Sequence, residues 1–135
     1  MEPQAGNRAR RALCAGALLM ATATILGALS EHMLRDRLAA ASYEVLQTAI
    51  RYQFFHALGL LVLGALQQRR HDRLLRVAAD VLLAGVLLFS GSLYLLVGGA
   101  PPAFGALAPL GGLGLIGGWL LAAVALWRTP PPRTE

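Results

Sequence analysis

Four long apolar runs divide this chain and restrict it to very few folds. Residues 12–29 and 103–127 carry no charged side chain, and residues 77–100 carry only Asp80. Another run is free of charge only from residue 52 to 66, so a spanning helix there must also include residues upstream of it. A helix needs roughly 20 apolar residues to cross a hydrocarbon core, and lipid tolerates only helices and closed barrels. The runs therefore predict four spanning helices, at about residues 12–29, 47–66, 77–97 and 109–127.

The composition excludes several other classes of protein. Hydrophobic residues make up 56% of the 135 residues and charged residues 14%, whereas soluble domains are about 25% charged and disordered chains have low hydrophobicity. The single cysteine, Cys14, excludes a disulfide scaffold and a cysteine-rich zinc site. The net charge is +5, but the arginines lie between the apolar runs rather than along one basic stripe. We therefore expect the lipid bilayer, and no nucleic acid, as the partner.

The same pattern predicts one domain and an orientation. Residues 12–127 form a single four-helix transmembrane domain, an all-α integral membrane bundle with short loops, and residues 1–11 and 128–135 form cytoplasmic tails. Pro109 fits the first turn of the last helix, where proline is tolerated. Cleavage of the first run as a secretory signal is the less favoured alternative, because it is longer than an h-region of about 7 to 15 residues.

Arginine placement predicts which side the termini occupy. With a cytoplasmic N-terminus, nine arginines fall inside and three outside, so the positive-inside rule favours N-in and C-in. The inner set is Arg8, Arg10, Arg11, Arg69, Arg70, Arg73, Arg76, Arg128 and Arg133, and the outer set is Arg35, Arg37 and Arg51.

Two strips of small residues predict helix-packing faces. Membrane helices associate through close backbone approach, which small residues permit. Whether these contacts lie within one chain or between chains stays open. The strip in the last run is Gly111, Gly114, Gly118, Ala122 and Ala125, and that in the first is Cys14, Ala17, Ala21, Thr24 and Ala28.

Polar residues at matched depth form a candidate cluster near the membrane midplane. Helix rise places Gln53, His56, Ser90 and Thr24 at similar heights, about 15 to 20 Å above the cytoplasmic boundary. Gln53 and His56 are three residues apart and share a helix face. One interpretation is a proton or solute step. The favoured interpretation is structural, with a neutral His56 hydrogen-bonding across helices and fixing their register.

Other polar residues are expected at the two interfaces. Arg51 is close enough to the outer boundary to snorkel, and Asp80 can pair with Arg76, four residues earlier on the same helix face. Trp127 has the position of an interfacial aromatic anchor. Glu31 and His32 belong to an outer loop that we interpret as solvated, with metal or ligand binding as the minority alternative. The sequence indicates no catalytic residue, metal site or cofactor.

Three ordered motifs carry a family resemblance. They are Thr48-Ala49-Ile50-Arg51-Tyr52-Gln53-Phe54-Phe55-His56-Ala57-Leu58, then Leu87-Leu88-Phe89-Ser90-Gly91-Ser92-Leu93-Tyr94, then Pro109-Leu110-Gly111-Gly112 with Gly117-Gly118-Trp119-Leu120. The resemblance that they carry extends over nearly the whole chain between its tails. The chain resembles the small YgdD-like four-span membrane proteins, which have bacterial members and mitochondrial relatives. It departs from their Gly-Ala-His pattern after the first span, where Ser30-Glu31-His32-Met33 keeps only the histidine. The resemblance implies a multi-pass protein of the bacterial inner membrane and supplies no reaction.

These observations favour a non-enzymatic accessory or interaction subunit, with another membrane protein or a second copy as its partner. The alternative is a small transporter or channel that uses Gln53, His56 and Ser90, although no internal repeat of the kind common in transporters is found. A membrane enzyme ranks third. Only Asp80 and His56 could act as acid or base within the spans, and they lie about 10 Å apart in depth.

Overall fold

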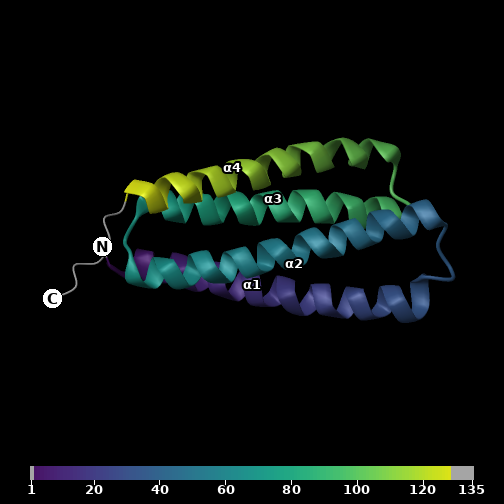
Figure 1. Ribbon diagram of the computed structural model, residues 1–135, viewed down its shortest axis with the longest axis horizontal. Coiled ribbons are helices and arrows are strands. Elements are labelled where there is room, and N and C mark those ends of the chain that lie inside the picture. Colours follow the sequence, from purple (N-terminus) through teal and green to yellow (C-terminus); the bar gives the residue numbers. More distant parts are fainter. Residues whose placement is uncertain (1, 129–135) are drawn as a thin grey trace.

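The computed structural model describes residues 2–128, with side chains from residue 6 onward, and that part of the chain folds into helices without a strand (Figure 1). Its four long helices are each long and apolar enough to cross a membrane. This confirms the predicted all-α membrane bundle. The helices are α1 at Glu2–Leu29, α2 at Ala40–Arg69, α3 at Arg73–Val97 and α4 at Leu107–Arg128.

The helices begin and end where the local sequence allows, which is not always where the apolar runs stop. The segment predicted as a separate tail, residues 1–11, is helical from residue 2 onward and forms the start of α1. The reason is that helix propensity does not depend on hydrophobicity, and the alanines and arginines of this segment both favour helix. Pro109 lies in the first turn of α4, as expected, since the helix begins at Leu107.

Short connections join the helices. A π-helical turn at Ser30–Leu34 extends α1 before the chain turns into α2. Asp72 caps α3, because its side chain accepts a hydrogen bond from the Leu74 backbone N–H at 2.7 Å. A 3-10 helix at Pro102–Ala106 leads directly into α4. Successive helices are therefore antiparallel, and both termini lie at the same end of the bundle (Figure 1).

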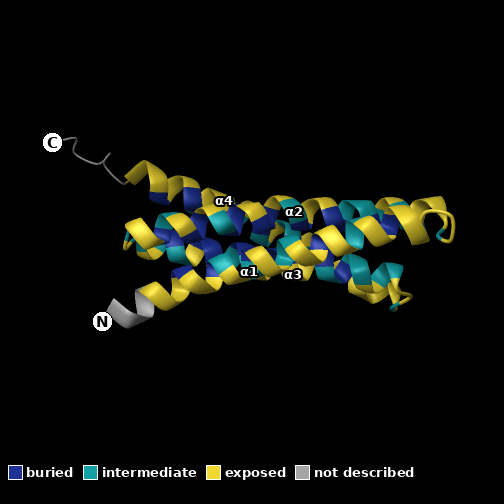
Figure 2. Cartoon of the chain, turned by 90° about the horizontal axis from the view of Figure 1, so that it is seen from below, coloured by how far each residue is buried: buried dark blue, intermediate teal, exposed yellow. Residues whose placement is uncertain are grey.

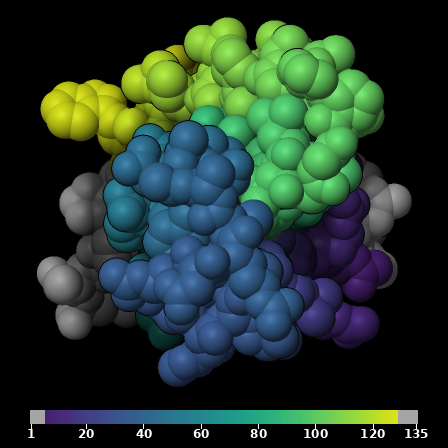
Figure 3. Space-filling model, turned by 90° about the vertical axis from the view of Figure 1, so that its right-hand side faces the viewer, coloured from purple at the N-terminus to yellow at the C-terminus, as the bar shows by residue number. Residues whose placement is uncertain are grey.

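The helices pack in chain order rather than as a closed ring. The main contacts join α1 to α2, α2 to α3 and α3 to α4, whereas α1 and α3 have only a few. The two central helices are α2 and α3, and α1 and α4 lie on opposite sides of the molecule (Figure 3). This arrangement leaves an open side between α1 and α3.

The core follows the seam of the two central helices. Its largest fully buried side chains include Leu60 and Leu63 of α2 and Leu75 and Leu82 of α3. Large apolar side chains such as Leu113 also cover the outside, where Figure 2 shows long exposed stretches on the helices. Apolar residues on both surfaces are what a bundle surrounded by lipid requires, since lipid tails are as apolar as leucine.

Candidate functional site

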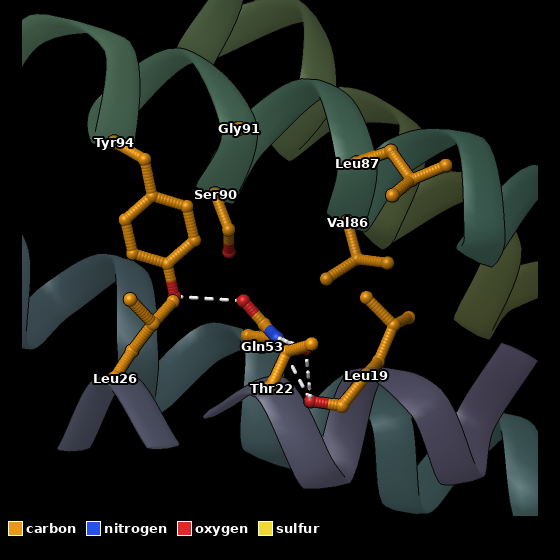
Figure 4. A pocket seen from close by; sticks show the side chains of 9 residues that line it. All are labelled: Leu19, Thr22, Leu26, Gln53, Val86, Leu87, Ser90, Gly91 and Tyr94. Carbon is orange, nitrogen blue, oxygen red and sulfur yellow. Dashed lines mark hydrogen bonds between the residues drawn. The ribbon is translucent and has the colours of Figure 1, made fainter. Parts of the chain in front are cut away.

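Gln53 of α2 is the centre of a buried hydrogen-bond network that connects three helices. Its Nε2 donates to the Leu19 carbonyl at 2.8 Å and to the Thr22 hydroxyl oxygen at 2.7 Å, both on α1. Its Oε1 accepts from the Tyr94 hydroxyl of α3 at 2.7 Å. Figure 4 shows these side chains pointing toward one another from the three helices. Tyr94 was not among the predicted residues, although its hydroxyl lies one helical turn after Ser90.

Ser90 lies beside this network, whereas Thr24 does not. The buried Ser90 hydroxyl donates to the Ala49 carbonyl of α2 at 2.9 Å. Thr24 is exposed and donates to the Met20 carbonyl of its own helix. The prediction of Thr24 is therefore corrected to Thr22. Two residues along a helix correspond to a rotation of about 200°, so equal depth did not mean the same face.

His56 is buried but belongs to a different environment. Its Nδ1 donates to the Tyr52 carbonyl at 2.7 Å, because a carbonyl can only accept. Tyr52 belongs to the same helix, so this bond differs from the predicted hydrogen bond across helices. Its ring centroid lies 6.2 Å from that of Trp119 on α4 and 5.9 Å from that of Tyr52. The predicted cluster of four is thus two sites, one around Gln53 and Ser90 and the other around His56 and Trp119.

A cavity of about 250 Å³ adjoins the Gln53 network. It lies on the open side between α1 and α3, with α2 behind it (Figure 4). Its wall is mostly apolar and contains no charged residue. The lining residues are Leu19, Thr22, Leu26, Gln53, Val86, Leu87, Ser90, Gly91 and Tyr94.

The three glycines of the predicted α4 strip lie against α3 of the same chain. A Cβ built on Gly111 would meet the Phe89 Cα at 2.7 Å, and one on Gly118 would meet the Leu82 Cγ at 2.8 Å. A Cβ on Gly114 would lie 3.2 Å from the Cα of Gly85. The contact whose partner the sequence left open is therefore made within the chain.

The small-residue strip of α1 faces away from the bundle, contrary to expectation. Ala21 and Ala28 are exposed, as is Cys14. The buried face is instead the one that includes Ala12, Gly16 and Ala23. On this face α1 approaches the backbone of α2 closely, because a Cβ on Gly16 would meet the Ala57 carbonyl oxygen at 2.8 Å.

At the end of the bundle where α1 begins, one ion pair differs from the prediction. Asp80 pairs with Arg8 at 3.2 Å, not with Arg76, because α1 continues far enough to bring Arg8 beside α3. Arg51 is exposed on α2, and Trp127 is 91% exposed near the end of α4.

At the opposite end, Glu31 is part of a polar network rather than a free loop residue. It accepts from the Tyr43 hydroxyl at 2.7 Å, and Arg35 pairs with it at 3.2 Å. His32 is exposed. Across the described residues, no group of three histidine, cysteine, aspartate or glutamate side chains is placed to hold a metal ion.

Four apolar helices, three of which are joined by a buried polar network, define a multi-pass helical membrane protein. Comparison with known proteins assigns the family: residues 26–112 match the model of DUF423, described as a protein of unknown function, so the chain belongs to that family. This confirms the YgdD-like resemblance, because the relatives carry the UPF0382 membrane protein name.

The relatives match over most of their own length. UPF0382 membrane protein YwdK of Bacillus subtilis is 35% identical over 82% of this chain and 90% of its own. UPF0382 inner membrane protein YgdD of Escherichia coli is 35% identical over 76% of this chain and 79% of its own. A UPF0382 membrane protein of Staphylococcus haemolyticus is 34% identical over 84% of this chain and 92% of its own. No solved structure matches. The predicted location in a bacterial inner membrane agrees with the name of the Escherichia coli relative.

Proposed function

We propose that this protein is a non-enzymatic accessory subunit that presents α1 to a partner helix in the membrane. The observation that carries the proposal is how little of α1 the bundle covers. Only 17% of its most apolar stretch is buried, against 28% in α3 and α4 and 50% in α2. Its uncovered side holds the small residues Cys14, Ala17, Ala21, Thr24 and Ala28. Small side chains permit the close backbone approach on which membrane helices rely for association.

The buried polar groups support this proposal over transport. Gln53 and Ser90 are engaged in hydrogen bonds between helices of the same chain. His56, the third residue of the transport alternative, bonds to its own helix and lies beside Trp119. The three side chains therefore do not form one polar path, and the hydrogen bonds of Gln53 and Ser90 join helices of the same chain.

Cys14 offers a direct test because it is exposed on the uncovered side of α1 and is the only cysteine. The full chain, expressed in native membranes, would be labelled at Cys14 with a short maleimide–diazirine crosslinker, whose photoactivated end reacts with any neighbouring side chain, and analysed by mass spectrometry. We expect a discrete crosslinked product. Its composition identifies the occupant as another membrane protein or as a second copy. The Cys14→Ser variant should yield no product.

Matched alanine variants test whether the contact depends on this face. Ala21→Leu places a bulky side chain two helical turns from Cys14 and should strongly reduce the product, because helices can no longer approach closely. Ala123→Leu adds the same bulk at an exposed position of α4 and should leave the product unchanged. Absence of a crosslinked product, or equal yields from both variants, would contradict the proposal.

A further inference from the structure

The cavity between α1 and α3 opens toward the lipid. Leu87, one of its lining residues, is 55% exposed, and Thr22 on the opposite helix is also exposed. Val86 and Ser90, which lie deeper, are buried. The cavity is therefore a recess in the side of the bundle that molecules dissolved in the bilayer can enter without crossing the protein.

Hydrogen-bond donors in the wall of the cavity are already used within the chain. Gln53 has two amide hydrogens, and its Nε2 donates to two oxygen atoms of α1. The Tyr94 hydroxyl donates to Gln53, and the Ser90 hydroxyl to a backbone carbonyl of α2. The Thr22 hydroxyl donates to the Leu18 carbonyl of its own helix at 2.9 Å. A ligand consequently finds no free side-chain donor there.

Acceptors, in contrast, remain available. A side-chain amide oxygen has two lone pairs, and the Oε1 of Gln53 accepts one hydrogen bond, from Tyr94. The hydroxyl oxygens of Tyr94 and Ser90 also have acceptor capacity beyond the bonds they donate. No charged residue lines the cavity. The wall therefore suits an uncharged group that donates a hydrogen bond, and it offers nothing to a carbonyl, ether or anion.

We propose that this recess binds an uncharged apolar molecule from the lipid phase that donates one hydroxyl hydrogen to the acceptors around Gln53. Its volume of about 250 Å³ is sufficient for one ring, because an apolar cavity of about 150 Å³ holds benzene. A phenol is the simplest molecule with these properties. The inference concerns a site inside the bundle and is independent of the partner helix proposed for α1.

A matched pair of probes tests it. The full-length protein in phosphatidylcholine nanodiscs, whose lipid has no hydroxyl, would be titrated with para-fluorophenol and with para-fluoroanisole, followed by fluorine NMR against empty nanodiscs. The phenol has a hydroxyl hydrogen to donate, whereas the ether carries a methyl group in its place and can donate none. We expect the phenol to bind about tenfold more tightly than the ether, which is the upper range for one hydrogen bond. Equal affinity, or no protein-dependent binding of the phenol, would overturn the proposal.

Two glycine variants locate the binding. Gly91 lines the cavity, and a Cβ there would meet no atom within 4 Å, so Gly91→Leu adds bulk at the recess without a clash. Gly117 of α4 is equally free of neighbours and lies outside the recess, which makes Gly117→Leu the control. We expect the first variant to lose phenol binding and the second to keep it. Retained binding in Gly91→Leu would overturn the assignment to this recess. Should Gly91→Leu fail to fold, Leu87→Trp, which adds bulk at the rim of the recess, takes its place. Loss of phenol binding is then expected in that variant, and retained binding would overturn the assignment.

Discussion

Individual glycines set the separation of α3 and α4. Gly111 lies against the backbone of Phe89, and Gly118 against Leu82, at distances that leave no room for a Cβ. The pattern of small residues in α4 predicted this face, because a spacing of three and four residues returns to the same side of a helix. The identity of the partner helix was beyond the sequence, since the pattern describes only one of the two surfaces.

Gly111→Ala should destabilise the bundle. The added Cβ would lie 2.7 Å from the Phe89 Cα, so the two helices must move apart. Overpacking of this kind costs about 1 to 3 kcal/mol. Gly117→Ala, where a Cβ meets nothing within 4 Å, is the control. Thermal unfolding in detergent would measure both, and equal midpoints for the two variants would contradict the expectation.

Tyr94→Phe should lower the free energy of unfolding by about 0.6 kcal/mol and by no more than about 1.7 kcal/mol, the range found for hydrogen bonds between membrane helices. Among the described residues, the variant removes the only donor to the Gln53 Oε1. Tyr52→Phe removes a hydroxyl without a hydrogen bond in the described chain and should have little effect. Unfolding in mixed detergent micelles gives both values. A loss in Tyr52→Phe as large as in Tyr94→Phe would exclude the hydrogen bond as the cause.

Among the helices, α1 is the one whose existence could be predicted from the sequence but whose buried side could not. Its existence followed from eighteen residues without a charge. Its buried side did not, because alanine, threonine and glycine occur on both faces and volume alone does not select one. The choice is made by α2, whose Ala57 backbone approaches Gly16 closely. The exchange of Thr24 for Thr22 and the exposure of Ala21 both follow from this single rotation of the helix.

The extension of α1 toward the N-terminus predicts a weak electrostatic link between α1 and α3. Arg8 and Asp80 are 3.2 Å apart, and their side chains are 51% and 46% exposed. Water screens such a pair, so its coupling energy should lie below about 1 kcal/mol. A double-mutant cycle of Arg8→Gln and Asp80→Asn measures it. A coupling of several kcal/mol would instead indicate that the pair is withdrawn from water.

Across the whole molecule, the two ends of the bundle differ in charge. Eight arginines of the described residues lie toward the end where α1 begins and α4 ends, whereas Arg35 and Arg37 lie toward the other end and Arg51 lies in the half of α2 nearer to that end. The positive-inside rule therefore predicts that both termini lie in the cytoplasm.

Reporter fusions to the C-terminus test this orientation. In a bacterial host, a fluorescent protein that matures only in the cytoplasm should be bright, and alkaline phosphatase, which is active only outside, should be inactive. The reverse result would contradict the orientation. Substituting Arg69, Arg70, Arg73 and Arg76 together by glutamine should weaken the preference, because this removes four of the nine arginines assigned to the cytoplasmic side.

The order in which the helices touch also bears on how the protein is made. Each new span emerges from the ribosome beside the one that will hold it, because neighbours in the chain are neighbours in space. No early segment has to wait for a distant late one, as it would in a ring closed by the first and last spans. Such local connectivity favours rapid assembly and allows the membrane to receive the chain one hairpin at a time.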